Sequence, residues 1–282
     1  MAEPLSSTAL FQGQPSLTLR HPCGDALQVL LHGAHIVSWQ VAGRERFYLS
    51  PRSIFDGRSA IRGGVPVCFP QFNQRGPLPK HGFARNLAWV QDGEAQIDGE
   101  AVRLSLRLSD GEATRAYWAQ AFQARLTVEL APRRSQITLS VHNTDVQDLE
   151  FSGALHSYFA VDDIASTSLE GLGAQAEWDA VRDVHGQGAA RLVFESEFDR
   201  VYAAAPRPLS LRSGAQTLQI TQSPSWAHTV VWNPGATLAA KIPDLGSDEH
   251  RHMLCVEAAQ VLEPIRVPAG AVWQGWQALK VL

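Results

Sequence analysis

The sequence is poor in cysteine. Its 282 residues include three cysteines, Cys23, Cys68 and Cys255, which are far apart in the chain. No two of them form a CxxC pair, so the chain has neither the spacing of a zinc knuckle nor that of a redox motif. A small, odd number of cysteines is typical of a protein from a reducing compartment.

Long apolar runs and targeting signals are also missing. No stretch approaches the roughly 18 consecutive apolar residues that indicate a membrane-spanning helix. The first residues, MAEPLSSTALFQGQ, have no positive region followed by an apolar run, so we expect no signal peptide. With the cysteine usage, this favours a cytoplasmic protein that has no membrane partner.

Neither an excess of positive charge nor a nucleotide-binding motif is present. The formal net charge is −4, which gives no general attraction to nucleic acid. The chain has no P-loop, GxGxxG, HExxH or GxSxG pattern. The sequence therefore supports neither nucleotide hydrolysis, hydride transfer nor serine-esterase chemistry, and we expect no cofactor and no metal.

What the chain does have is period-two alternation of apolar and polar residues, which is typical of half-buried strands. The alternation is clearest over Ala101–Leu108, over Phe122–Leu130 and from Ile137 to Val141. The last two runs flank the turn-like residues APRRS and predict a hairpin with a five-residue loop. Further predicted strands are Leu27–Leu31, His35–Val41, Leu218–Thr221, Thr229–Trp232, Met253–Val256 and Trp273–Val281.

Helical periodicity is absent from every window of about twelve residues. Glycine (22) and proline (16) interrupt the apolar runs at short intervals. This predicts an all-β antiparallel sandwich or barrel, and one domain over residues 1–282 is the simplest organisation. The loosest stretches, Asp179–Ala190 and Ala203–Gly214, are predicted to be loops.

One segment, from Gly57 to Val90, differs from the rest of the chain. It contains no acidic residue, but it carries six basic side chains: Arg58, Arg62, Arg75, Lys80, His81 and Arg85. Its glycines and prolines make a long strand or helix improbable. Because arginine can grip a phosphate through two parallel hydrogen bonds, an anion site is one interpretation. A solvated basic loop is the other, and the small patch disfavours nucleic acid.

Two further side chains stand out because of their surroundings. His156 lies among bulky apolar residues in ALHSYFAV, and Glu257 follows the apolar run in HMLCVEAAQV. Both are expected at or near strand ends, either as satisfied structural residues or as acid–base groups. The pairs His250/His252 and His32/His35 are better explained as a mobile polar loop and as neighbouring strands or a turn, respectively.

Taken together, these stretches resemble the aldose 1-epimerase superfamily, and specifically its hexose-6-phosphate mutarotase (glucose-6-phosphate 1-epimerase) branch. The resemblance covers most of the chain from about Gly33 to Leu279 and implies a galactose-mutarotase-like β-sandwich. The stretches that carry it are GAHIVSWQ, IRGGVPVCFPQFN, KHGFARNLAWV, LHSYFAV, FDRVY, VVWNPG, VEAAQV and VPAGAVWQGWQAL.

The resemblance also implies roles for individual residues. The family's catalytic acid corresponds to His156 and its base to Glu257. The arginines associated with the sugar phosphate correspond to Arg62 and Arg85, and Asp199 of FDRVY is expected to hold sugar hydroxyls.

Two positions of the KHG stretch are less defined. Lys80 stands where the family has Gln, so it either adds charge at the phosphate or points away. His81 resembles a histidine that contacts substrate in the branch acting on unphosphorylated sugars.

The implied reaction interconverts the α and β anomers of a hexose 6-phosphate, most simply glucose 6-phosphate. An acid and a base on opposite sides of the hemiacetal would open and close the ring, without metal or cofactor. The expected partner is a small sugar phosphate, and the expected state is a monomer. A mutarotase for unphosphorylated aldoses and a non-catalytic sugar-phosphate-binding protein remain the alternatives.

Overall fold

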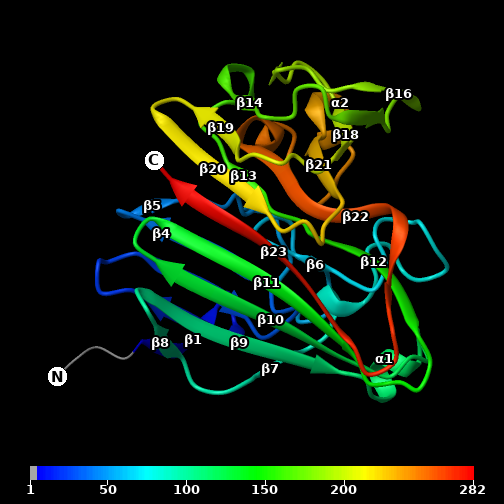
Figure 1. Ribbon diagram of the computed structural model, residues 1–282. Coiled ribbons are helices and arrows are strands. Elements are labelled where there is room, and N and C mark those ends of the chain that lie inside the picture. The colour runs from blue at the N-terminus through cyan, green and yellow to red at the C-terminus, as the bar shows by residue number, and fades with distance from the viewer. Residues whose placement is uncertain (1–4) are drawn as a thin grey trace.

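The computed structural model, which describes residues 5–282, consists almost entirely of antiparallel strands (Figure 1). The helices among these residues are single turns: α1 (Glu112–Arg115), α2 (Gly235–Ala239) and the 3₁₀ turns η1 (Ala84–Asn86), η2 (Ile164–Ser166) and η3 (Glu249–His252). The predicted all-β class is confirmed. No helix in this part of the chain is long and apolar enough to cross a membrane.

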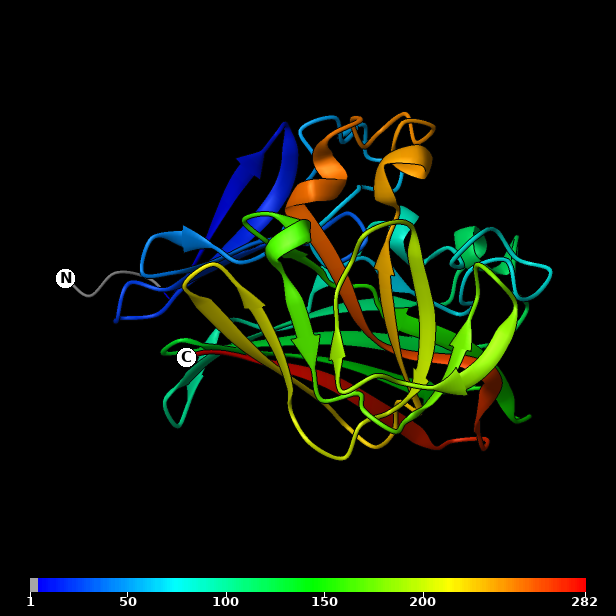
Figure 2. The same cartoon turned by 90° about the horizontal axis from the view of Figure 1, so that it is seen from above.

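The strands form three sheets. A small sheet at the N-terminal end is a simple meander of five consecutive strands: β1 (Ser6–Phe11), β2 (Gln14–Arg20), β3 (Ala26–Leu30), β4 (Ile36–Val41) and β5 (Arg44–Glu45). Each strand pairs with the next one, and Figure 2 shows this sheet at one end of the molecule, in blue.

The largest sheet has ten strands and provides one long wall of the molecule. Its spatial order is β17 (Arg191–Leu192), β14 (Ser168–Glu170), β19 (Leu209–Ser213), β20 (Gln216–Gln222), β23 (Val272–Val281), β11 (Arg134–Asn143), β10 (Phe122–Ala131), β9 (Ala101–Ser109) and β7 (Val90–Gln91), with β8 (Gln96–Asp98) also on β9. C-terminal strand β23 lies between β20 and β11, so the end of the chain closes the middle of the sheet (Figure 1).

The third sheet has eight strands and carries the site described below. Its order is β16 (Val184–Gln187), β15 (Ala176–Asp179), β18 (Phe198–Ala203), β21 (His228–Asn233), β22 (Met253–Val267), β12 (Leu149–Leu155) and β6 (Val67–Cys68), with β13 (Tyr158–Ala160) also on β22. β22 is central, because it pairs with β12, β13 and β21.

Each strand predicted from the alternation is present, but two details were wrong. Ala131 pairs directly with Arg134, so the β10–β11 hairpin turns through Pro132 and Arg133 alone, and Arg133 has a φ of 58°. The predicted loop regions contain all of β16 and β19. Strand β16 is exposed on both faces, so it has no apolar alternation that the sequence could reveal.

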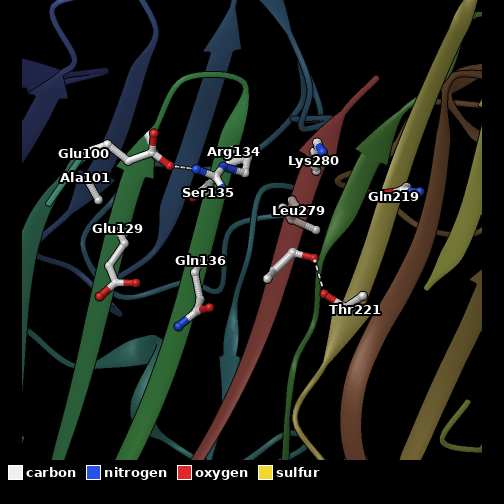
Figure 3. A pocket seen from close by; sticks show the side chains of 12 residues that line it. Glu100, Ala101, Glu129, Arg134, Ser135, Gln136, Gln219, Thr221, Leu279 and Lys280 are labelled. Atoms are coloured by element: carbon white, nitrogen blue, oxygen red, sulfur yellow. Dashed lines mark hydrogen bonds and ion pairs between the residues drawn. The ribbon is translucent and has the colours of Figure 1, made fainter. Parts of the chain in front are cut away.

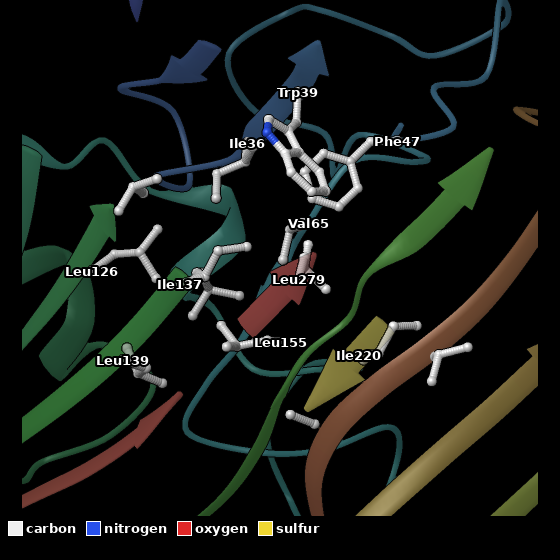
Figure 4. Close-up of a cluster of buried hydrophobic side chains, with 14 of the residues drawn as sticks. Ile36, Trp39, Phe47, Val65, Leu126, Ile137, Leu139, Leu155, Ile220 and Leu279 are labelled. Atoms are coloured by element: carbon white, nitrogen blue, oxygen red, sulfur yellow. The ribbon is translucent and has the colours of Figure 1, made fainter. Parts of the chain in front are cut away.

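The core lies between the sheets. The apolar positions of the ten-stranded sheet point inward and meet Trp39, Phe47 and Val65 from the N-terminal part of the chain (Figure 4). Leu126, Ile137, Leu139 and Leu279 from this sheet are each at most 2% exposed: 0%, 0%, 0% and 2% respectively. Their polar neighbours in sequence face outward, which explains the period of two.

From Met253 to Val261, strand β22 is buried on both faces. Leu254, Val256 and Ala258 pack into the main core, whereas Cys255 and Ala259 point the other way, into two smaller apolar clusters. A strand buried on both sides reads as a continuous apolar run, which accounts for MLCVEAAQV. Glu257 lies in the middle of this strand, so the predicted strand end was wrong.

Candidate active site

A cavity of about 310 Å³ lies on the face of the eight-stranded sheet that is turned away from the main core. Its lining includes all seven side chains that the sequence singled out: Arg62, Lys80, His81, Arg85, His156, Asp199 and Glu257. These residues come from segments that are nearly 200 positions apart in the sequence, so the fold brings them together.

Strand register explains the floor of the cavity. Val230 of β21 is opposite Glu257 of β22, and Trp232 of β21 is opposite Asp199 of β18. Directly opposed residues in antiparallel strands project from the same face of the sheet. The register therefore places the Asp199 and Glu257 carboxylates on one surface, with an apolar and an aromatic side chain between them.

The basic segment forms part of the cavity wall, and two of its glycines explain its path. A Cβ on Gly64 would lie 2.0 Å from Ile36 O, and one on Gly82 would lie 2.1 Å from Phe69 O. Both glycines also have positive φ values, 59° and 72°. Only glycine permits such close backbone approaches, and these fix the positions of the adjacent Arg62 and His81.

His156 and Glu257 are adjacent in the cavity. His156 follows β12 directly, and its Nδ1 lies 3.3 Å from Glu257 Oε1. Glu257 is 1% exposed and His156 is 8% exposed. Neither His156 Nδ1 nor Glu257 Oε2 has a hydrogen-bond partner among the described residues. Buried polar atoms without partners are costly and mark a place where a ligand can supply the missing hydrogen bonds.

Burial shifts the pKa values of both His156 and Glu257 in the direction that favours the neutral form of each. It lowers the pKa of His156 well below its ordinary value, and the positive charges of Arg85 and Arg62 lower that pKa further. Burial also raises the pKa of Glu257 well above its ordinary value, and the charge of Asp199 adds to this effect. The empty cavity therefore favours a neutral imidazole beside a carboxylic acid.

The aromatic neighbours hold the imidazole ring in place. Tyr158 stacks on His156, with ring centroids 4.8 Å apart and an angle of 7° between the planes. Trp232 meets both rings edge-on. Tyr158 was not singled out from the sequence. It comes two residues after His156, and this spacing in an extended segment could have identified it as a neighbour of His156.

The three cations of the cavity differ in their partners. Arg62 is ion-paired with Asp244, at 3.0 Å from Nη2 to Oδ1, and its Nη1 donates to Tyr158 Oη at 3.3 Å. Arg85 donates to the backbone oxygen of Lys80 at 2.8 Å, and its Nε is buried without a partner. Lys80 is exposed at the rim. Asp244 lies in a loop, and no sequence signal pointed to it.

Asp199 lines the same cavity as the cations. Burial raises the pKa of Asp199 to about 6, and the charge of the nearby Glu197 contributes to the shift. A carboxylate of this kind accepts hydrogen bonds readily when a ligand supplies hydroxyl donors. Glu197, which also lines the cavity, was missed, although it lies only two residues before Asp199.

The donor atoms of His156, Cys255 and Glu257 all lie within 4.8 Å of one another. Nitrogen, sulfur and oxygen donors at such distances are compatible in type with a transition-metal ion. The spacing of these residues in the sequence gave no indication of the cluster, because it depends on the β12–β22 pairing.

The two histidine pairs of the sequence analysis contact backbone carbonyls. His35 Nε2 contacts Gly63 O at 2.7 Å, and His32 Nε2 contacts Ser59 O at 3.1 Å. His250 and His252 lie in η3 and contact Ser247 O and Asp162 O. The predicted turn at His32 and His35 is confirmed, whereas His250 and His252 lie in a 3₁₀ turn and not in an irregular loop.

A second hollow lies on the outer face of the ten-stranded sheet (Figure 3). Two of its charged side chains, Glu100 and Arg134, pair with each other, and Thr221 donates to the backbone oxygen of Ala278. It holds no buried acid–base pair and so differs chemically from the first cavity.

Comparison with known proteins agrees with this geometry. The aldose 1-epimerase family profile matches residues 15–280. The chain belongs to the aldose 1-epimerase family. The predicted family is thus confirmed, and the protein is an isomerase that acts on a sugar.

Individual relatives support the same assignment. A protein from Cenchrus ciliaris named "Putative glucose-6-phosphate 1-epimerase" is 35% identical over 283 residues, which is 96% of this chain and 85% of the relative. A crystal structure of a "putative mutarotase" from Salmonella typhimurium superposes with a TM-score of 0.90 at 29% identity, covering 100% of this chain and 95% of the other.

The fold extends to more distant proteins. Galactose 1-epimerase from Lactobacillus acidophilus superposes with a TM-score of 0.74 over 99% of both chains, at only 14% identity. This similarity concerns the fold alone, and it confirms the predicted galactose-mutarotase-like sandwich.

Proposed function

We propose that this protein is a hexose-6-phosphate mutarotase that interconverts the α and β anomers of glucose 6-phosphate. The observation that carries the proposal is the buried pair of His156 and Glu257, 3.3 Å apart, in a cavity whose rim is basic. The names of the relatives agree with a phosphorylated substrate.

The pair can perform both proton transfers that ring opening requires. His156 donates a proton to the ring oxygen as the bond from C1 to that oxygen breaks, and Glu257 accepts the proton of the O1 hydroxyl. Rotation about the C1–C2 bond presents the other face of the aldehyde, and the two groups then reverse their roles to close the ring. Each transfer by a positioned group contributes about 10²–10⁴-fold in rate.

His156 and Glu257 lie 3.3 Å apart, which is closer than an acid and a base placed on opposite sides of a hemiacetal would be. This suits the reaction, because the ring oxygen and O1 are bonded to the same carbon. It also means that the pair can be considered as a unit that carries one proton, whichever residue holds it. The pKa directions favour Glu257 as the residue that holds this proton in the sugar-free protein.

Binding of the phosphate would favour the catalytic arrangement of this proton. The charges of Arg85 and Arg62 lower the pKa of His156, and a phosphate dianion near them would offset that effect. The substrate would thus promote transfer of the proton from Glu257 to His156. This links the phosphate to the acid step as well as to binding.

The three cations are proposed to contribute unequally to phosphate binding. Arg85 and Lys80 have no carboxylate partner among residues 5–282, so they are proposed to bind the phosphate most directly. Arg62 is proposed to contribute to the same site, but its ion pair with Asp244 already neutralises part of its charge. Asp199 is proposed to accept hydrogen bonds from the sugar hydroxyls.

The test is the rate of anomer exchange, measured by NMR on glucose 6-phosphate and on glucose at equal protein concentration. We expect strong acceleration with the phosphorylated sugar and weak acceleration with glucose. Equal acceleration would identify a mutarotase for unphosphorylated aldoses, and no acceleration of either sugar would identify a binding protein. EDTA is included, because the proposed chemistry requires no metal ion; loss of activity on chelation would contradict this.

A further inference from the structure

The loop from Phe72 to Gly82 closes on itself through an unusual reciprocal contact. The backbone N–H of His81 donates to Asn73 O at 2.9 Å, and the backbone N–H of Asn73 donates to the His81 ring at Nδ1, at 3.3 Å. Both residues have left-handed backbones, with φ values of 66° for His81 and 49° for Asn73. Residues other than glycine are uncommon there, and such conformations persist where the surroundings over-determine them.

The thiol of Cys68 makes a second contact with the same nitrogen. Cys68 Sγ lies 3.1 Å from His81 Nδ1, and both side chains are buried. Burial raises the pKa of the Cys68 thiol far above its ordinary value, so the sulfur retains its proton. Cys68 is therefore able to donate a hydrogen bond to the ring.

These contacts decide the tautomer of His81. A backbone N–H can only donate, so the Asn73 contact favours Nδ1 as an acceptor, and the thiol of Cys68 adds to this preference. Burial lowers the pKa of His81 far below its ordinary value, with the positive neighbours acting in the same direction, so the ring is neutral. A neutral imidazole with an unprotonated Nδ1 carries its hydrogen on Nε2.

The ring is also oriented toward the catalytic pair. It meets Phe72 at 88° and His156 at 65°, with centroids 5.3 Å apart in both cases. His81 lines the cavity, and Nε2 is the ring nitrogen that Cys68 and Asn73 do not occupy. A fixed donor in such a position can contact an oxygen of a bound sugar next to His156.

We propose that Cys68 is a positioning residue: with the Asn73 N–H, its thiol holds His81 as the neutral Nε2–H tautomer, which donates a hydrogen bond to a sugar oxygen. The donor role rests on the proposed function, whereas the tautomer is a property of the sugar-free protein. This gives Cys68, which has no part in the proton transfers, a specific chemical role.

The first experiment is long-range ¹H–¹⁵N NMR of protein labelled at histidine, without sugar. The His81 signals, assigned by comparison with His81→Gln, should show a protonated Nε2 and an unprotonated Nδ1. Cys68→Ser keeps a donor and should preserve this pattern. Cys68→Ala and the bulkier Cys68→Val remove the donor and should increase the Nδ1–H population.

Kinetics on glucose 6-phosphate provides the second readout. Loss of one neutral hydrogen bond predicts a decrease in kcat/KM of roughly 2- to 12-fold for Cys68→Ala and Cys68→Val, with recovery in Cys68→Ser. Adding glucose 6-phosphate to the labelled wild type should also shift the His81 Nε2–H signal.

Three results would overturn the proposal. The first is an Nδ1–H tautomer in the wild type. The second is a folded Cys68→Val variant with unchanged tautomer and unchanged kinetics. The third is an Nε2–H signal that saturating glucose 6-phosphate leaves unmoved while activity is present. If the tautomer depends on Cys68 but neither sugar is converted, the positioning role stands and the proposed function fails.

Discussion

Two hollows of the molecule, similar in size, differ in the kind of polar group that their walls leave without a partner. The cavity on the eight-stranded sheet measures about 310 Å³, and the hollow on the outer face of the ten-stranded sheet about 360 Å³. In the first, His156 Nδ1, Glu257 Oε2 and Arg85 Nε are buried without partners. In the second, Glu100 and Arg134 pair with each other, and the group left buried without a partner is the neutral hydroxyl of Ser135.

This difference shows that size does not identify the functional hollow. A sheet face that only meets water can satisfy its polar groups with solvent and with neighbours, at little cost. The cavity instead holds an acid and a base away from water, where each is destabilised until a ligand arrives. The predictions below test this contrast, from the largest expected effect to the smallest.

The largest effect is expected at the catalytic pair. His156→Ala and Glu257→Gln should each lower kcat on glucose 6-phosphate by about 10²–10⁴-fold, because each removes one partner of the proton transfers. The double variant should be little worse than either single variant, since the two groups act as a unit. Circular dichroism provides the folding control. Near-full activity of either folded single variant would refute the assignment.

The next effect is expected at Arg62, because it is ion-paired with Asp244 and also contacts Tyr158, which supports the His156 ring. Arg62→Ala removes the charged contact with Asp244 and frees Tyr158, which stacks on His156. We expect a loss of about 10- to 150-fold in kcat/KM, for glucose as well as for glucose 6-phosphate. Asp244→Asn is the matched control and should reproduce the loss on glucose. A loss confined to the phosphorylated sugar would show that Arg62 serves the phosphate alone.

The sequence predicted much of the fold because alternation is strong where one face of a strand meets the core and the other meets water. It failed for β16, which is exposed on both faces, and for the position of Glu257 within β22, whose first nine residues are buried on both faces. In neither strand do apolar and polar residues alternate. The one-domain organisation and the monomeric state stay predictions.

The seven candidate residues were recognised through short motifs, and the structure shows that they share one cavity. The supporting residues Asp244 and Cys68 could not be recognised in the same way. Asp244 reaches Arg62 across 182 positions of sequence, and Cys68 reaches His81 only because the loop between them closes. Such contacts depend on tertiary packing and leave no local pattern.

A smaller effect is expected at Asp199, in the pH dependence of the free energy of unfolding. Its pKa is raised to about 6 in the folded protein, above the ordinary value of 3.8. The folded state therefore binds the proton more tightly than the unfolded state, and this contribution to stability is lost as the pH rises from about 4 to about 6.

Asp199→Asn removes that pH dependence. Relative to wild type, the variant should gain stability between pH 4 and pH 7, by on the order of 1–3 kcal/mol. Urea denaturation across this range measures the gain. An unchanged difference between variant and wild type at all pH values would show that Asp199 does not titrate as described.

The smallest effect is expected in the outer hollow. Lys280→Ala and Thr221→Ala alter its lining, and both residues lie on the solvent face of the ten-stranded sheet (Figure 3). Stability should change by no more than about 0.5 kcal/mol, and kcat/KM should stay within about 2-fold of wild type. A large loss of activity in either variant would mean that the two hollows are not functionally distinct.

The central claim, that one cavity joins acid–base chemistry to phosphate binding, is tested most directly at Arg85. The measurement is kcat/KM for glucose 6-phosphate and for glucose in wild type, in Arg85→Ala and in Arg134→Ala as the outer-face control. We predict that Arg85→Ala lowers the value for the phosphorylated sugar by roughly 10- to 150-fold while the value for glucose hardly changes, and that Arg134→Ala resembles wild type. Equal losses on both sugars in Arg85→Ala would contradict the claim.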